Sequence, residues 1–230
     1  MGRVAPEHSA TTTALLWAGV VAAALFVVVG AVEGALRPGY RAASMPLSAL
    51  SLGSRAWVQI ASFVITGAGM LACAIGVAGV LPGDVAGRRW AVALLAAFGV
   101  GLVASGVFVM DPPLEGGLTG VGPAGDVADG AADQLASRTW HGVVHDVAGF
   151  VVFLSLSAAM LTLGGGLLGT AWGRWIGVVS LVTGAAVLAL FVAYVVTSVA
   201  APHIAGVAQR VLVVVGWSGL AWTAALLARS

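Results

Sequence analysis

The stretch that decides the fold is Thr13–Leu36, which reads TALLWAGVVAAALFVVVGAVEGAL. It contains one ionisable side chain, Glu33, close to its end. A helix needs about 20 mostly apolar residues to cross the hydrocarbon core of a bilayer. The stretch is longer than the apolar region of a secretory signal peptide and has no clear cleavage motif of small residues. We therefore predict a retained transmembrane helix.

Apolar runs of the same kind recur along the chain of 230 residues, which is 60% hydrophobic and 8% charged. Soluble domains carry about 25% charged residues. We therefore predict an all-α membrane protein, a single integral membrane domain over residues 1–230 that folds as a bundle of six transmembrane helices. The predicted spans are residues 13–36, 56–81, 90–110, 139–168, 172–200 and 208–227.

Two of the connections between these spans are long enough to have structure of their own. Residues 41–55 are too short to span and contain Pro46 and several serines, which predicts a short interfacial or re-entrant segment over one mouth of the bundle. Residues 114–137 are rich in glycine and aspartate, a composition that predicts a mobile loop.

The other connections bear on orientation. Those after the second and fourth spans are short, and Arg88 and Arg89 follow the second span. Because arginines favour the cytoplasmic side, we predict a multi-pass protein of the cell membrane with both termini in the cytoplasm. The arginine totals of the two sides are equal, so the short loops and the arginine pair decide this prediction.

Composition also limits the classes of function. The net charge is +1, which gives no indication of a nucleic-acid partner. Cys73 is the only cysteine, so no disulfide can form within the chain, and no Walker motif or nucleophile elbow is present. The partners that this composition favours are membrane lipids, with a small amphipathic substrate as a further candidate.

The residues able to do chemistry follow the first, third and fifth spans, and so lie on one side of the membrane. His141 and His145 are four residues apart, so that both imidazoles can face one metal ion, and His203 follows the next span on the same side. Three histidines with a carboxylate would suit zinc with an open position for water, which makes zinc the candidate cofactor. The alternative is that the histidines cap neighbouring groups or bind water.

Three acids on the same side, Glu33, Asp111 and Asp146, are the candidate catalytic carboxylates. An isolated acid inside a span is costly, which argues for a function at Glu33 as a general base, a ligand or the partner of Arg210. The alternative for Glu33 is an ion pair with Arg37, four residues later, at the membrane boundary.

The candidate substrate-binding residues are Arg37, Tyr40, Gln209 and Arg210. An arginine can hold a phosphate or a carboxylate through two parallel hydrogen bonds. The alternative for Arg210 is that it reaches to the interface, or forms a structural ion pair with Asp111 or Asp146.

Three functions remain open on this evidence. The leading hypothesis is a metal-dependent membrane enzyme that acts on a lipid-like substrate at an extracytoplasmic mouth of the bundle. The second is a non-enzymatic lipid-binding, transport or accessory subunit. The third is an isoprenoid cyclase or isomerase in which Glu33 or Asp111 protonates an apolar substrate.

Several stretches of the chain form a recognisable set: Arg37-Pro38-Gly39-Tyr40, Leu50-Ser51-Leu52-Gly53, Trp57-Val58-Gln59, Gly106-Val107-Phe108-Val109-Met110-Asp111-Pro112, Thr139-Trp140-His141-Gly142-Val143-Val144-His145-Asp146 and Gln209-Arg210. With these stretches the chain resembles a family of uncharacterised polytopic bacterial membrane proteins, the domain of unknown function 998. The resemblance covers most of the chain and implies about six spans without implying an activity.

Overall fold

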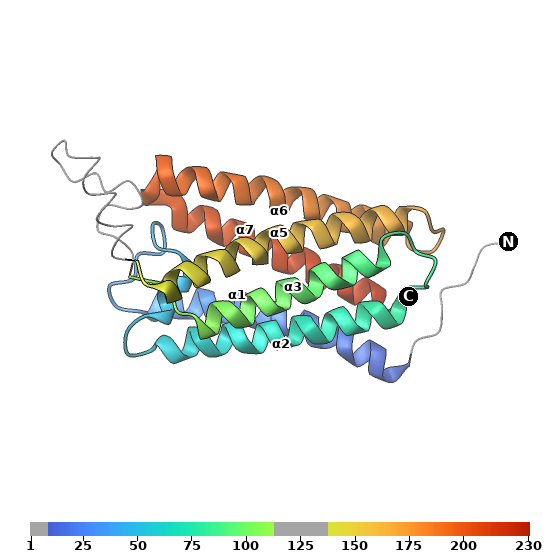
Figure 1. Cartoon of the computed structure of the whole chain (residues 1–230), viewed down its shortest axis with the longest axis horizontal. Coiled ribbons are helices and arrows are strands. Elements are labelled where there is room, and N and C mark those ends of the chain that lie inside the picture. The colour runs from blue at the N-terminus through green and yellow to red at the C-terminus, as the bar shows by residue number, and fades with distance from the viewer. Residues whose placement is uncertain (1–8, 113–137) are drawn as a thin grey trace.

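A computed structural model describes residues 9–112 and 138–230, and every regular element in these ranges is helical (Figure 1). Six helices are long and apolar enough to cross a membrane, so the predicted all-α membrane class and the number of spans are confirmed. They are α1 (Ala10–Leu36), α2 (Ala56–Val80), α3 (Arg88–Val107), α5 (Trp140–Leu168), α6 (Arg174–Ala200) and α7 (Pro202–Leu227), with a short 3-10 helix, η1 (Leu47–Ser51), between α1 and α2.

The helix boundaries differ from the predicted spans by three residues or more at three places, and the first is that α1 begins at Ala10 rather than at residue 13. Helix α7 begins at Pro202 rather than at residue 208, because proline is well suited to the first turn, where its missing N–H costs nothing. Helix α3 ends at Val107 rather than at residue 110, and Phe108 after it is extended. The predicted mobile loop, residues 114–137, lies outside the described residues.

The helices form a ring in chain order. Each long helix packs against the next one described along the chain, and α7 returns to pack against α1. Small residues make the close approaches possible: a Cβ atom added at Gly67 of α2 would lie 2.6 Å from the carbonyl oxygen of Gly99 in α3. Trp217 fills the centre of the ring, where it stacks on Phe26 at 5.3 Å and meets Phe98 edge-on at 5.1 Å.

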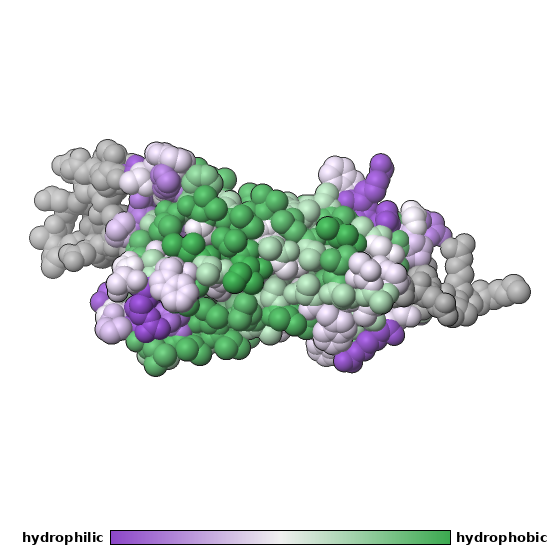
Figure 2. Space-filling model, turned by 90° about the horizontal axis from the view of Figure 1, so that it is seen from below, coloured by the Kyte–Doolittle hydropathy of each residue, from purple (hydrophilic) through white to green (hydrophobic). Residues whose placement is uncertain are grey.

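The outer surface is that of a membrane protein. Figure 2 shows a broad apolar middle with hydrophilic residues gathered at both ends. Exposed tryptophans mark the two boundaries, with Trp57 and Trp140 near one end and Trp90 and Trp175 near the other, as expected for residues at the level of the lipid headgroups. Helix α1 begins at the same end of the bundle at which α7 finishes (Figure 1).

Candidate functional site: a cavity at the polar end of the bundle

The end of the bundle that carries η1, the start of α5 and the start of α7 is called the polar end below. The segment between α1 and α2 folds back into this end. Its residues Leu47, Ala49 and Leu50, all in η1, are buried among the helices. Residues 41–55 are called the re-entrant segment below, and the helix within them is a 3-10 helix of five residues.

Two side chains at the start of α7 hold this segment in place. Arg210 donates to the carbonyl oxygens of Ala42 at 2.6 Å and Met45 at 3.1 Å, and also bonds to the Tyr40 hydroxyl. Gln209 accepts a hydrogen bond from the backbone N–H of Leu47 at 2.7 Å. Arg210 and Tyr40 thus stabilise the fold of the polar end, and no ion pair joins Arg210 to Glu33 in the described residues.

Burial raises the pKa of the Tyr40 phenol, and the Arg210 guanidinium opposes that shift. The phenol therefore stays protonated at neutral pH. It donates to the carbonyl oxygens of Met45 and Pro46, at 3.2 Å and 3.0 Å, which ties Tyr40 to the start of η1.

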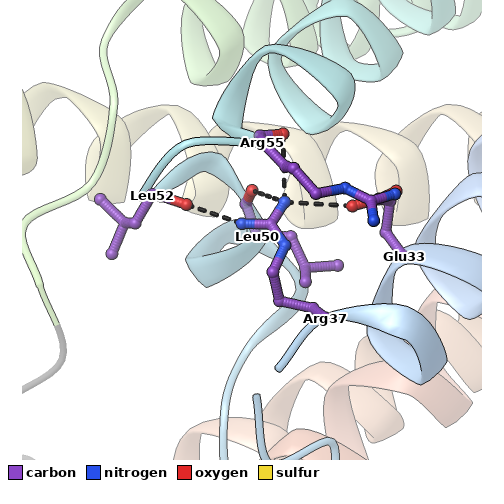
Figure 3. A network of polar contacts seen from close by, with 5 residues as sticks. All are labelled: Glu33, Arg37, Leu50, Leu52 and Arg55. Atoms are coloured by element: carbon purple, nitrogen blue, oxygen red, sulfur yellow. Dashed lines mark hydrogen bonds and ion pairs between the residues drawn. The ribbon is translucent and has the colours of Figure 1, made fainter. Parts of the chain in front are cut away.

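Glu33 lies at the centre of a second set of contacts, called the Glu33 cluster (Glu33, Arg37 and Arg55; Figure 3). Only 4% of Glu33 is exposed. Its carboxylate accepts from Arg37 at 3.1 Å and from Arg55, so the i, i+4 pair predicted as one alternative is present. Arg37 also donates to the carbonyl oxygens of Leu50, Leu52 and Arg55. The cluster therefore joins the end of α1 to the part of the re-entrant segment that leads into α2.

The other two acids form a separate set, called the rim cluster (Asp111, Arg138 and Asp146). Asp111 accepts from the backbone N–H and the hydroxyl of Thr139, at 3.0 Å and 2.6 Å, and so joins the end of α3 to the start of α5. A carboxylate is stabilised at a helix N-terminus by the helix dipole. Arg138 pairs with Asp146 and has its Nε 3.9 Å from Asp111.

Gly142 allows this approach of α3 to α5. A Cβ atom there would lie 2.1 Å from an oxygen of Asp111. A glycine is therefore needed at this position if Asp111 is to reach the N-terminus of α5.

The three histidines do not converge. His145 is 6% exposed and points its Nδ1 at the carbonyl oxygens of Ser105 and Phe108, at 3.1 Å and 2.8 Å. His141 is exposed and packs on the ring of Trp140, and His203 is exposed at the start of α7. Within residues 9–112 and 138–230 no group of three or more His, Cys, Asp or Glu side chains is placed to hold a metal ion.

A cavity of about 940 Å³ opens between the helices at the polar end, and it separates the candidate residues into two groups. All three members of the rim cluster line it, together with His145 and Gln209. The candidates that do not line it, within the described chain, are Glu33, Arg37, Tyr40, His141, His203 and Arg210.

The residues that line the cavity change from charged to aromatic with increasing depth in the bundle. Along α5 it runs from Thr139 at the helix start to Phe153, a distance of about 21 Å at 1.5 Å per residue. The charged groups lie in the outer half of this path: Asp111 and Arg138 next to Thr139, and Asp146 seven residues further along α5. The inner end is apolar, and its aromatic rings come from five different helices: Phe26, Phe63, Phe153, Phe191 and Trp217.

One wall of the cavity also reaches the outer surface of the bundle. Phe150 of α5 and Val199 of α6 line the cavity and are about half exposed, at 51% and 52%. Beyond Phe191, no residue of α6 is buried. Phe150 and Val199 therefore belong both to the cavity wall and to the exposed surface of α5 and α6.

Three residues of this region were not among the sequence candidates. Arg138 belongs to the rim cluster, and its place just before the N-cap Thr139 is the feature that could have identified it. Tyr194 lines the cavity and accepts from Gln209 at 3.3 Å; a tyrosine inside an otherwise apolar span was a usable indication. Gln59 of α2 is fully buried, and its amide makes no hydrogen bond with any described group.

Comparison with known proteins identifies the family of the chain but not its activity. The model of the family described as "Protein of unknown function (DUF998)" matches residues 20–228, which is nearly the whole chain. No curated protein and no solved structure matches. On the strength of the family match, this six-span membrane protein belongs to the DUF998 family.

Proposed function

We propose that the protein binds one lipid-like amphipathic molecule in the cavity at its polar end. The observation that carries this proposal is the gradient along the cavity, from the charged rim cluster at its outer end to the aromatic side chains at its inner end. An amphipathic molecule has the same gradient, with a polar head and an apolar tail.

The size and the opening of the cavity support the same conclusion. Pockets for small molecules occupy about 300–1,000 Å³, and the cavity of about 940 Å³ lies near the top of that range. Phe150 and Val199 line the cavity and are half exposed on apolar helices, so we propose that an apolar tail enters from the bilayer past these two side chains.

The geometry gives less support to the two enzymatic hypotheses. A zinc enzyme would need ligands from His141, His145 and His203, and only His145 lines the cavity. An acid that protonates an apolar substrate would need a free carboxyl group. Glu33 does not line the cavity, and Asp111 is occupied by Thr139.

The proposal is tested with two glycines of α5. Neither would place a Cβ atom within 4 Å of any non-local group, so both tolerate a larger side chain. Gly149 lines the cavity, whereas Gly165 lies on the outer surface near the other end of the helix. The variants Gly149→Leu and Gly165→Leu therefore add the same side chain to the same helix, and only the first fills the cavity.

The measurement is native mass spectrometry of protein purified from membranes in mild detergent, which counts bound amphiphiles per chain. We expect Gly149→Leu to lose most of the bound molecule and Gly165→Leu to match the wild type. Equal loading of all three proteins would overturn the proposal.

We also propose that the polar end faces the extracytoplasmic side of the cell membrane. The short loops at the other end, with Arg88, Arg89 and Arg174, support this orientation. In the variant His203→Cys the exposed new thiol should react with a membrane-impermeant maleimide added to intact cells. Reaction only after the cells are lysed would place the polar end in the cytoplasm instead.

A further inference from the structure

We infer that His145 is the residue that selects the head of the bound molecule, and that this head is a hydroxyl group. The inference rests on the proposed function, since it concerns the same cavity. It follows from the direction in which the two nitrogens of the His145 ring point.

The first step concerns Nδ1. It lies 3.1 Å from the carbonyl oxygen of Ser105 and 2.8 Å from that of Phe108. Carbonyl oxygens only accept hydrogen bonds, so Nδ1 must carry the proton. In neutral imidazole the other nitrogen, Nε2, is then a hydrogen-bond acceptor.

The second step concerns Nε2. The two nitrogens of an imidazole point away from each other, so a ring whose Nδ1 faces the end of α3 turns its Nε2 away from that helix. The ring lines the cavity, and no described group bonds to Nε2. The edge of Phe63, with ring centroids 6.1 Å apart, packs against His145 and helps to fix its orientation.

The third step concerns the position of His145 along the cavity. It follows Thr139 by six residues and precedes Phe153 by eight, and the carboxylate of Asp146 is the next residue along the helix. We assign this depth to the head of the amphiphile, with its tail towards Phe153. An acceptor that faces the cavity here can bond a ligand that brings a donor.

The charges of the rim cluster narrow the choice of head. The cluster has two carboxylates and one guanidinium, and no other Asp, Glu, Lys or Arg among the described residues lines the cavity. A fatty-acid anion would be repelled by this net negative charge and has no proton to donate to Nε2. An alcohol is neutral and has one. A long-chain amine also has one, but as a cation it would be held by the two carboxylates whether or not His145 accepts a hydrogen bond. The ligand class whose binding would depend on His145 is therefore a long-chain alcohol or a lipid with a free hydroxyl.

The experiment compares two probes that differ at one atom position, hexadecan-1-ol and methyl hexadecyl ether, with palmitate as a third. Native mass spectrometry in detergent gives the bound fraction of each. For the wild type we expect the alcohol to bind about tenfold more tightly than the ether, as one hydrogen bond would provide, with palmitate the weakest.

The variant is His145→Asn. The amide nitrogen of asparagine can take the place of Nδ1 and keep the bonds to Ser105 and Phe108, while the Nε2 acceptor is lost. We expect the variant to bind the alcohol and the ether equally. The matched control is His141→Asn, which changes an exposed histidine one turn earlier and should keep the wild-type preference.

Equal binding of alcohol and ether by the wild type would overturn the inference, as would a preference for the alcohol that survives in His145→Asn. The wild-type comparison decides the matter even if the variant does not fold. The proposed function fails separately, if none of the three probes binds or if Gly149→Leu binds them as well as the wild type does. Binding of palmitate alone would overturn the inference and leave the proposed function standing.

Discussion

The Glu33 cluster and the rim cluster lie at the same end of the bundle, and both consist of carboxylates and arginines. They differ in whether their hydrogen-bonding groups are available to a ligand in the cavity. In the Glu33 cluster two arginines share one carboxylate, and the terminal N–H groups of Arg37 also reach three carbonyl oxygens. The Nε–H of Arg37 is buried without a partner among the described groups, but Arg37 does not line the cavity. In the rim cluster two carboxylates share one arginine, and 44% of the Asp146 side chain is exposed.

This difference separates a structural ion cluster from one available to a ligand. The Glu33 cluster is buried and does not line the cavity in the described chain, so its charges stabilise the re-entrant segment. The rim cluster lines the cavity and has acceptor capacity left over. Ionisable groups near a membrane core are costly in both cases, but the cost alone does not indicate function. Unused hydrogen-bonding capacity next to a cavity does.

The largest loss of folding stability is expected for Glu33→Gln, which removes the carboxylate at the centre of the Glu33 cluster. The change leaves Arg37 and Arg55 without a counter-ion, and removing one partner of a buried pair costs about 3 kcal/mol or more. We expect a clearly lower midpoint of thermal unfolding in detergent. Protein that remains folded should still bind the amphiphile. A variant of wild-type stability that has lost binding would make Glu33 a functional residue after all.

A smaller loss of stability is expected for Gly142→Ala. The added methyl group would lie 2.1 Å from an oxygen of Asp111 and must displace it from the start of α5. Overpacking of this kind costs about 1–3 kcal/mol. The matched control is Gly149→Ala on the same helix, where a Cβ atom meets nothing within 4 Å. Equal unfolding midpoints for the two variants would show that Asp111 is not held as described.

The smallest effect on stability is expected for Asp146→Asn. This variant tests directly whether the charge of the rim cluster acts on a ligand. Ion pairs of half-exposed groups contribute about 0–1 kcal/mol, so the unfolding midpoint should change little. The charge of the rim cluster rises from −1 to 0, and palmitate should therefore bind better relative to hexadecan-1-ol than it does to the wild type. An unchanged ratio of the two affinities would mean that the rim charge does not select the head.

Much of the fold could be predicted from the sequence, because each span is recognised from the length and the apolar composition of its own residues. An apolar run such as Thr13–Leu36 has to be helical in a bilayer, since only a helix satisfies its backbone hydrogen bonds internally. Three boundaries differ from the predictions. Those at Ala10 and Pro202 depend on local capping, and that at Val107 lies next to Phe108, whose carbonyl oxygen meets His145 of α5.

The candidate site was predictable only in part. The sequence placed the polar groups on one side of the membrane, and it offered the Glu33–Arg37 pair as one alternative. It could not distinguish His145, which lines the cavity, from His141, which does not, although both lie at the start of one helix. Their four-residue spacing permits a shared metal ion but does not require one.

The membrane class, the six spans and the common side of the polar residues could thus be predicted from the sequence. Each depends on the hydrophobicity and the length of one segment, and not on how the segments pack together. Only the tertiary structure decided which of those residues face the cavity. That outcome depends on how α3, α5, α6 and α7 pack: a buried carboxylate such as Glu33 is neutralised by whichever cations the packing brings to it. A nitrogen such as Nε2 of His145 is left for a ligand when the packing brings no partner to it.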